Sequence, residues 1–353
     1  MKAPRAIIEV EGASVQWSDI IDIKVENTLY LAADSFECRL NNEAFLSDWF
    51  RKEQQVKIFM GYVKNPDKWS KDELKHIFTG KIDGIKPSFD NPCTVNIIGR
   101  DYSAPLLDTE YSVAYKDITS SQVAIILAKK YGLKPKVTAT TTILSKDLHA
   151  DKKEWEVLQA AADLDGFVCY VTKEKELYYG ERDEKDDETN VELFYRQGGK
   201  SNCRVEFDDS SVGVLNKVTV RHWVSKETQL IEASSQDDFL IEAMGQVKER
   251  IFYVSKAKTV ALAKQYADKL LKQYSRSVIT GSGSCAGNPE MYAESKVKVT
   301  GCGRFSGVYY IDRISHTLSK SAGYTNSFDI TSLRPENAHQ YRRDLYNYKE
   351  KRY

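Results

Sequence analysis

Hydrophobic and polar positions alternate with a period of two over most of the first hundred residues. Val56, Ile58 and Met60 are each separated by one residue, which is the pattern of a strand with one buried face. Asn65-Pro66 and Asn91-Pro92 supply turn chemistry, because proline fixes φ and asparagine closes the bend. Several short strands separated by such turns predict a small antiparallel barrel or sandwich.

Helical spacing replaces this alternation in the next part of the chain. Thr119 and Gln122 form a predicted capping box at the start of a helix. This helix is predicted to end at Gly132, because glycine readily adopts the left-handed conformation that follows a helix. A second short helix, with Asp151 as its predicted N-cap, ends in the same way at Gly166. These elements predict a middle domain that combines helices with strands.

The second helix carries the hydrophobic face that predicts the core of this middle domain. Trp155, Leu158 and Ala162 lie on one side of the helix, and a predicted hairpin begins directly after it at Phe167. We expect Trp155 to pack with Leu158 against this hairpin. The charged run 181–188 follows the hairpin and predicts a solvated loop at a domain boundary.

Alternation returns after the charged run, and one long helix over 257–274 interrupts it. The predicted fold class is α+β, mostly antiparallel β, with two small β-barrel-like domains that flank a helix-containing middle domain. The predicted domains are a first β-barrel at 1–112, an α+β middle domain at 113–200, a second β-barrel with a long helix at 201–335, and a C-terminal arm at 336–353.

Two similar segments indicate an internal repeat. Residues 56–61 precede Phe78-Thr79-Gly80, and residues 297–301 precede Phe305-Ser306-Gly307. The first copy has a long insertion before its aromatic residue, whereas the second has a tight turn. The match is short, so a chance similarity and a duplication are both compatible with it. A duplication would give two related barrels.

Composition and charge narrow the class of protein. Of 353 residues, 41% are hydrophobic and 29% are charged, which excludes disorder over the whole chain. The 51 basic and 51 acidic residues balance, which argues against a dedicated nucleic-acid binder. The six cysteines form no C-x-x-C pair and are expected to be reduced thiols. Neither a signal-peptide pattern nor an apolar run long enough to span a membrane is expected.

Candidate chemistry along the chain is sparse. Asp163 and Asp165 are two residues apart on a predicted helix, so they are expected to point apart as exposed charges. The segment 301–307 resembles a dinucleotide loop, but it joins two predicted strands, whereas a phosphate loop must open a helix. Each of five widely spaced histidines is expected to be a surface or strand residue: His76, His149, His222, His316 and His339. We therefore predict no catalytic, cofactor-binding or metal-binding residues, and no enzyme.

Two stretches carry a resemblance to one family. Residues 153–167 resemble the helix-then-strand signature of the phage late-control D tail proteins and of the hub part of VgrG spike proteins, in which a W-x-x-L helix ends in a G-[FY] turn. Residues 301–330 are similar to a second pattern of that family, G-x-G-x-F-x-G-x-Y followed by a histidine and an alternating strand. Gly245 to Arg250, Phe78-Thr79-Gly80 and Gly99-Arg100-Asp101 resemble further family segments. Together the resemblance spans roughly residues 5 to 335.

The resemblance implies the baseplate hub of a contractile phage tail or tail-like injection system. It implies a homotrimeric ring with two barrels per subunit, hence six similar lobes, which joins a six-fold inner tube to a three-fold spike. The spike is expected to be a separate polypeptide. Other expected partners are tube or tube-initiator proteins and further baseplate subunits, with no specific nucleic acid. Assembly is expected in the bacterial cytoplasm, and the product would be a component of a virion or tail-like particle.

Two other functions compete with this interpretation: a cell-wall hydrolase that acts in penetration, and a β-barrel module that binds carbohydrate or nucleic acid. The glycine turns are expected to let strands bend sharply, with a positive φ at the last glycine of the second segment. The positions predicted to matter structurally are Trp155, Leu158, Gly166, Phe167, Phe78, Gly80, Gly301, Gly307 and Tyr309.

Overall fold

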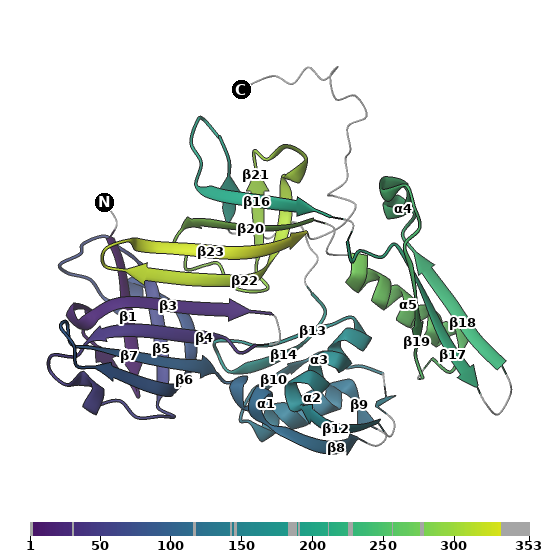
Figure 1. Ribbon diagram of the computed structural model, residues 1–353, viewed down its shortest axis with the longest axis horizontal. Helices are drawn as coiled ribbons and strands as arrows, with labels where there is room; N and C mark the ends of the chain where they lie inside the picture. Colours follow the sequence, from purple (N-terminus) through teal and green to yellow (C-terminus); the bar gives the residue numbers. More distant parts are fainter. Residues whose placement is uncertain are drawn as a thin grey trace.

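The computed structural model describes residues 3–29, 32–115, 118–141, 143–144, 147–182, 189, 191–210, 212–224, 229–255, 257–275 and 279–332. Figure 1 shows two sheet units stacked one above the other, a middle domain beside the first unit, and an arm that combines strands with helices at the far end. The predicted fold class, α+β with mostly antiparallel strands, is confirmed. The predicted C-terminal arm and most of the charged run 181–188 lie outside the described residues.

The first sheet unit is built from alternating strands around one hydrophobic core. Ile8, Ile58 and Ile97 are fully buried in this core, while intervening residues face outward, as the period-two pattern predicts. Its elements are β1 (Ala3–Val10), β2 (Ala13–Val15), η1 (Trp17–Asp19), β3 (Ile20–Thr28), β4 (Ser35–Asn41), η2 (Leu46–Asp48), β5 (Gln55–Val63), η3 (Lys71–Glu73), β6 (Lys75–Ser88) and β7 (Thr94–Asp101).

The middle domain packs helices against a three-stranded sheet. The predicted capping box of Thr119 and Gln122 is confirmed at the start of α2. The second helix begins at Glu154 with Lys153 as its N-cap, so the predicted cap at Asp151 is wrong. The elements are α1 (Ala104–Asp108), β8 (Glu110–Tyr115), β9 (Ile118–Thr119), α2 (Ser120–Lys130), β10 (Lys134–Val137), β11 (Ile143–Leu144), β12 (Asp147–Lys153), α3 (Glu154–Asp165), β13 (Val168–Val171) and β14 (Glu176–Gly180).

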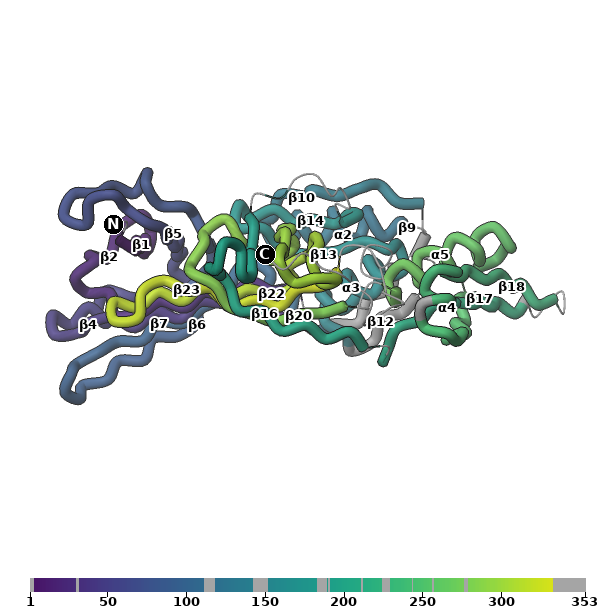
Figure 2. Tube along the Cα trace, turned by 90° about the horizontal axis from the view of Figure 1, so that it is seen from above, coloured from purple at the N-terminus to yellow at the C-terminus, as the bar shows by residue number. Residues whose placement is uncertain are grey.

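The last part of the chain forms the second sheet unit and the arm. The unit contains β15 (Glu192–Phe194), β16 (Cys203–Asp209), β20 (Ile279–Ala286), β21 (Lys296–Thr300), η5 (Gly303–Phe305), β22 (Gly307–Ser319) and β23 (Gly323–Ser332). The arm, inserted between β16 and β20, contains β17 (Lys217–Val224), β18 (Gln229–Gln236), α4 (Asp238–Met244), β19 (Glu249–Tyr253) and α5 (Val260–Ser275). Figure 2 shows that β17, β18 and α5 lie at the opposite end of the molecule from the first unit.

The two sheet units have the same strand order. The first runs β3-β4-β7-β6-β5-β1, and the second runs β16-β20-β23-β22-β21-β15. Without the short β2, which pairs with β1 at the end of the sheet, the six strands of each unit, numbered along the chain, lie in the order 2-3-6-5-4-1. The outermost pair differs, because β1 is antiparallel to β5 whereas β15 is parallel to β21. A shared order of this length supports duplication over a chance similarity.

A bulge at the same place in both units fixes the alignment of the repeat. The pairing of β6 with β7 shifts at Asp83, and the pairing of β22 with β23 shifts at Asp312. Both aspartates lie within an Ile-Asp-x-Ile sequence. The partners of the preceding strand agree as well, since Val56 lies opposite Gly80 and Val297 lies opposite Tyr309. Gly80 therefore corresponds to Tyr309, and the alignment of the two aromatic-x-glycine motifs predicted from the sequence is displaced by two residues.

The two units are joined into one sheet by pairing of β22 with β3. The resulting sheet runs from β16 at one end to β2 at the other and counts 13 strands within the described residues. Figure 1 shows the strands β16, β20, β23, β22, β3 and β4 stacked from top to bottom. The predicted pair of separate barrels is therefore a pair of similar units that share one continuous sheet.

Candidate assembly surfaces

The joint between the two units shows how this fold continues a sheet from one unit to the next. Residues 313–319 of β22 lie antiparallel and opposite residues 22–28 of β3. On the outer face, Glu26 lies 2.7 Å from Lys24 Nζ and 3.2 Å from Arg313. The hydrogen bond from Lys24, together with the charge of Arg313, lowers the pKa of Glu26. Because these groups are partly exposed, they select the register more than they stabilise the joint.

His316 occupies the inner face of this joint. The ring lies opposite Val25 and is fully buried. Its Nδ1 is 2.7 Å from the hydroxyl of Tyr324, and its Nε2 is 3.0 Å from the carbonyl oxygen of Met291. A carbonyl oxygen only accepts, so Nε2 carries the proton and Nδ1 accepts from the tyrosine. Burial lowers the pKa of His316 to about 4, so the ring is a neutral core residue, in agreement with the strand position predicted for it.

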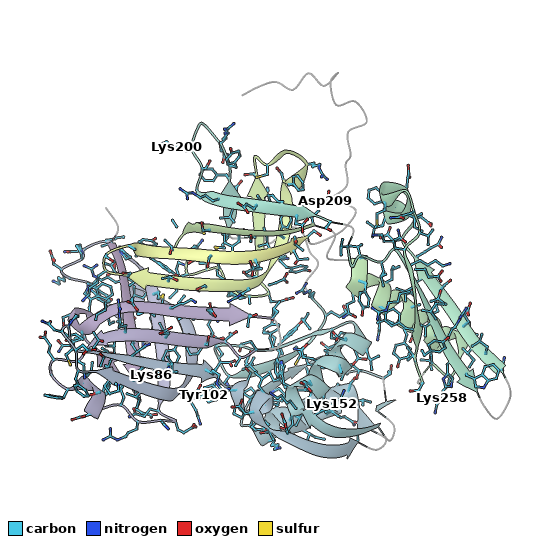
Figure 3. The ribbon with its side chains drawn as sticks, viewed as in Figure 1. Lys86, Tyr102, Lys152, Lys200, Asp209 and Lys258 are labelled. Atoms are coloured by element: carbon cyan, nitrogen blue, oxygen red, sulfur yellow. The ribbon has the colours of Figure 1, made fainter. Side chains whose placement is uncertain are left out.

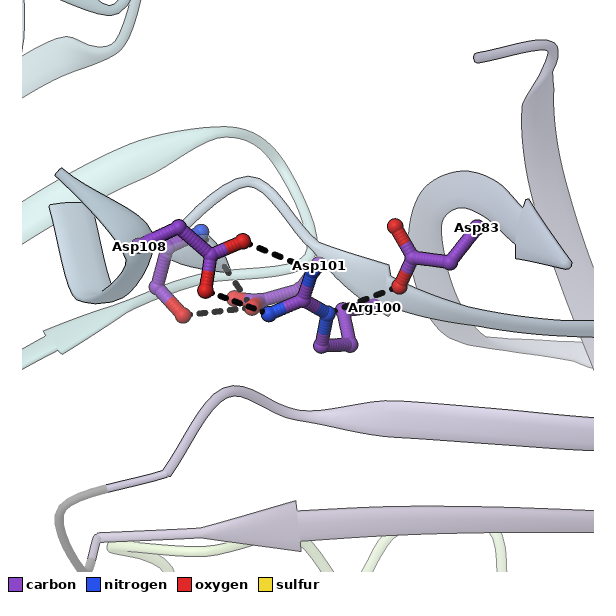
Figure 4. A network of polar contacts seen from close by, with 5 residues as sticks. Asp83, Arg100, Asp101 and Asp108 are labelled. Carbon is purple, nitrogen blue, oxygen red and sulfur yellow. Dashed lines mark hydrogen bonds and ion pairs between the residues drawn. The ribbon is translucent and has the colours of Figure 1, made fainter. Parts of the chain in front are cut away.

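The bulged aspartate of the first unit is held by an arginine at the end of β7 (Figure 4). Arg100 Nε donates to Asp83 at 2.7 Å, and its two terminal nitrogens donate to Asp108 at 2.9 and 2.8 Å. The bidentate bond from Arg100 lowers the pKa of Asp108. The bulge of the sheet is thereby tied to α1, the first helix of the middle domain.

The bulged aspartate of the second unit is held by a buried arginine. Arg182, two residues after the end of β14, lies 3.2 Å from Glu294 and 3.1 Å from Asp312, and all three side chains are less than 15% exposed. Its guanidinium lies 4.6 Å from the ring centre of Tyr310, and Thr331 also donates to Asp312. Burial opposes the charge of Arg182, but the two carboxylates outweigh it and raise its pKa. This network joins the end of the middle domain to the second unit.

Two carboxyl groups lie at a cavity between the first unit and the middle domain. Asp34 accepts hydrogen bonds from Asn27 at 2.9 Å and from the backbone N–H of Thr28 at 2.8 Å, and Asp101 accepts from Ser103. Burial raises the pKa of Asp34 to about 6, and burial with the charge of Asp34 raises that of Asp101. The cavity measures about 310 Å³. Both carboxylates hold backbone turns, which is a structural use of the pair.

The described residues contain no group of three or more His, Cys, Asp or Glu side chains arranged to hold a metal ion. No helix among the described residues is both long and apolar enough to cross a membrane.

The residues predicted to anchor the middle domain lie in one core. Trp155 is 3% exposed and Leu158 is fully buried. Gly166 ends α3 with φ of +70°. Phe167 packs edge-on against Tyr179, with ring centres 5.6 Å apart. The structure therefore brings these four predicted positions together around the hairpin.

The positions predicted in the two sheet units have different surroundings. Phe78 is buried in the core of the first sheet unit, and Tyr309 is buried in the core of the second sheet unit. Gly301 has φ of +79°, and a Cβ there would lie 2.0 Å from a backbone carbonyl oxygen. A Cβ at Gly80 would lie 2.3 Å from a carbonyl oxygen of β7. Gly307 does not have a positive φ, and a Cβ would meet nothing closer than 3.9 Å, so the special geometry predicted for it is wrong.

Asp165 differs from its predicted place as an exposed charge. It is the last residue of α3, is 2% exposed, and accepts hydrogen bonds from Tyr179 and Ser120. Lys269 of α5 lies 3.8 Å away. The rule that residues two apart point in different directions holds for Asp163 and Asp165, but it does not say which of them faces a neighbouring helix. The contact with α2 is non-local and left no signal in the sequence.

The arm presents an apolar face on the side of its sheet away from α5. Trp223, Leu230, Ile251 and Tyr253 are between 41% and 76% exposed. Cross-strand pairing places Trp223 opposite Leu230, while Val218 and Val220 on the other face pack against α5. Aromatic side chains exposed in this way are typical of protein contact surfaces.

Comparison with known proteins adds a family and a set of related folds. The profile of the family described as the Alg8 N-terminal domain matches residues 43–320. The chain belongs to this family. Comparison with curated proteins gives no significant match.

Several solved structures share the fold of this family member. A tail protein from Neisseria meningitidis MC58 is 14% identical, with a TM-score of 0.73 over 95% of this chain and 98% of that chain. The 43 kDa tail protein of prophage MuSo2 from Shewanella oneidensis is 17% identical, with a TM-score of 0.69 over 95% and 99%. A component of the E. coli type VI secretion system, described as similar to phage T4 tail proteins gp27 and gp5, is 12% identical, with a TM-score of 0.55 over 92% and 76%. The predicted resemblance to tail hub proteins is confirmed at the level of the fold.

Proposed function

We propose that this chain is a non-enzymatic baseplate hub of a contractile phage tail or tail-like injection system. In this role three copies form a ring that joins a six-fold inner tube on one side to a separate three-fold spike on the other. The observation that carries the proposal is the duplicated strand order of the two sheet units. Three copies of a chain with two similar units present six similar units, which is what matching six-fold to three-fold symmetry requires.

Further features support a mechanical role. The bulged aspartate of each unit is tied to the middle domain through an arginine, Arg100 in the first unit and Arg182 in the second. Both ties use ionic groups with several contacts, which resist small displacements better than a single exposed ion pair. The apolar arm face is available for other baseplate subunits. Assembly in the bacterial cytoplasm before release of the particle fits the expected reduced state of the thiols.

The test is to purify the chain alone and with its neighbouring spike and tube proteins, then measure mass by light scattering and symmetry by electron microscopy. We expect a trimeric ring whose averaged images show six lobes with three-fold symmetry. A chain that remains monomeric at micromolar concentration, both alone and with the spike, would overturn the proposal. Turnover of purified peptidoglycan by the wild-type chain would instead favour a cell-wall hydrolase.

A further inference from the structure

The first unit has an unpaired stretch of strand at the place where the second unit is paired. In the second unit, β22 pairs with β21 through Tyr310 and then with β3 from Arg313 onward. In the first unit, β6 pairs with β5 only as far as Lys81. On that side residues 83–88, here termed the β6 open edge, pair with no strand among the described residues.

The backbone around both bulges follows the same pattern. Ile82 exchanges two hydrogen bonds with the segment before β5, donating to Gln54 at 3.0 Å and accepting from Glu53 at 2.8 Å. Ile311 exchanges the same two bonds with the segment before β21. The next carbonyl in the second unit, that of Asp312, accepts from Leu29 of the joint at 2.9 Å. The carbonyl of Asp83 is the corresponding acceptor, at the start of the β6 open edge.

A second unpaired edge lies on β16, the strand at one end of the sheet. β16 pairs with β20 on one side and, among the described residues, with nothing on the other. β16 takes the place in the second unit that β3 takes in the first. β16 pairs with β20, which lies beside β23, and β3 pairs with β4, which lies beside β7. Figure 3 shows Lys86 on the first unit and Asp209 at the end of β16, far apart across the stacked strands. The two edges therefore cannot pair within one chain, but a second copy can bring them together.

We propose that the β6 open edge of one copy pairs with β16 of the next copy, in the register that β22 and β3 already use within each chain. This inference rests on the proposed ring, and it names the strands that close it. A head-to-tail contact between two different edges is the heterologous type that generates a closed ring. The sheet of each copy would then continue into the sheet of the next.

The internal joint fixes the register that this contact must have. Ser315 lies three residues after the bulged Asp312 and pairs with Glu26. Lys86 lies three residues after the bulged Asp83 and so corresponds to Ser315. Glu26 corresponds to Asp208. In each unit, this residue lies two strands away from the residue that contacts the bulged aspartate, and the pairings across the intervening strand connect the two positions. Lys86 of one copy is therefore placed opposite Asp208 of the next.

The side chains at these positions are complementary. Lys86 and Asp208 are both exposed and have opposite charges, and among the described residues neither has an ion-pair partner. Two residues farther along the strand, the partly exposed Ser88 faces Glu206. On the inner face Pro87 faces Phe207, a half-buried ring of the second core. Opposite charges across a strand pair favour this register, and like charges would disfavour it.

Pro87 shows that the contact differs from the internal joint in one respect. Along a strand, the backbone hydrogen-bonding groups of successive residues point to opposite sides. The backbone groups of Asp83, Ile85 and Pro87 therefore face the incoming strand. Proline has no N–H, and the ladder therefore has one hydrogen bond fewer than the pairing of β22 with β3. A proline on an open edge also discourages pairing with arbitrary strands, which suits an edge that must accept only one partner.

The pairing is tested by crosslinking between copies. Lys86→Cys and Asp208→Cys are combined in one chain with Cys93→Ser, which removes a partly exposed native thiol nearby. Mild oxidation with diamide is expected to convert most of the protein to covalent dimers and trimers on a non-reducing gel. The matched control combines Lys86→Cys with Arg204→Cys, which lies four residues, about 13 Å, along β16 from the predicted partner, and should crosslink at least tenfold less.

A charge exchange gives an independent measurement. Lys86→Glu and Asp208→Lys, each alone, are expected to raise the concentration at which half the chains are assembled by about fivefold or more, and the double variant should return it to within about twofold. Equal crosslinking of the predicted and control pairs, or crosslinks only within one chain, would overturn the pairing. A wild-type trimer without these crosslinks refutes this inference alone, whereas a wild-type monomer refutes the proposed ring itself.

Discussion

Arg182 provides the sharpest test of how the middle domain is attached to the second sheet unit. Its guanidinium balances Glu294 and Asp312, and the three side chains are 11%, 8% and 14% exposed. Replacing Arg182 by alanine removes the cation that Glu294 and Asp312 share in this network. Removing one partner of a buried ion pair costs about 3–5 kcal/mol, and the lost contact with Tyr310 adds to this cost.

The measurement compares the chemical denaturation of Arg182→Ala with that of wild type, and tryptophan fluorescence monitors the unfolding. Arg182→Lys keeps the charge but not both contacts, so its stability should lie between that of wild type and that of Arg182→Ala. The decisive control combines Arg182→Met with Glu294→Gln and Asp312→Asn. This neutral version of the network is expected to recover part of the loss, because the desolvated charges are absent. A loss below about 1 kcal/mol for Arg182→Ala would refute the interpretation that this network holds the two parts together.

Three further predictions follow from particular residues. Trp155→Ala should cost about 3–5 kcal/mol in denaturant unfolding because its ring is buried, with Trp155→Phe losing much less; a cost below about 1 kcal/mol would contradict this packing. Gly301→Ala should lower the melting temperature by several degrees, whereas Gly307→Ala, which has space for a Cβ, should leave it nearly unchanged; equal effects would contradict the assigned geometry. His316 has its pKa lowered from 6.5 to about 4 in the folded chain, so its contribution to stability is present above pH 6.5 and is lost as the pH falls toward 4. Wild type should therefore lose about 3 kcal/mol more than His316→Gln between pH 7 and pH 4, and parallel pH profiles of the two proteins would contradict a buried neutral ring.

Local chemistry could be predicted from the sequence, and non-local contacts could not. The capping box at Thr119 and the helix end at Gly166 depend on residues within one turn, so their patterns were sufficient. The repeat is visible in the sequence at Val56 and Val297, but the aromatic-x-glycine motifs align its second half two residues out of register. The structure aligns the units on Asp83 and Asp312 instead, because both aspartates lie at the bulge that the two units share.

The buried polar groups were missed for a related reason. Arg182 stands at the start of a charged run, where composition predicts a solvated side chain. Its burial depends on Glu294 and Asp312, more than a hundred residues away. The sequence pattern predicts an exposed Asp165, because it does not report the hydroxyl of Ser120, which belongs to a different helix and donates to this carboxylate. Such contacts exist only after the chain has folded, so no spacing in the sequence reports them.

The joint of β22 with β3 has a consequence for the kinetics of assembly. Six separate chains need five encounters before their ring closes, and at equilibrium the concentration of the ring varies with the sixth power of the free-chain concentration. In a ring of three copies, each chain already holds two units in contact, so three of the six junctions form during folding at the high effective concentration of a linked pair. Only two encounters then remain before the ring closes, and the concentration of the ring varies with the third power of the free-chain concentration. In the proposed ring, tying units in pairs would thus favour complete rings at low protein concentration.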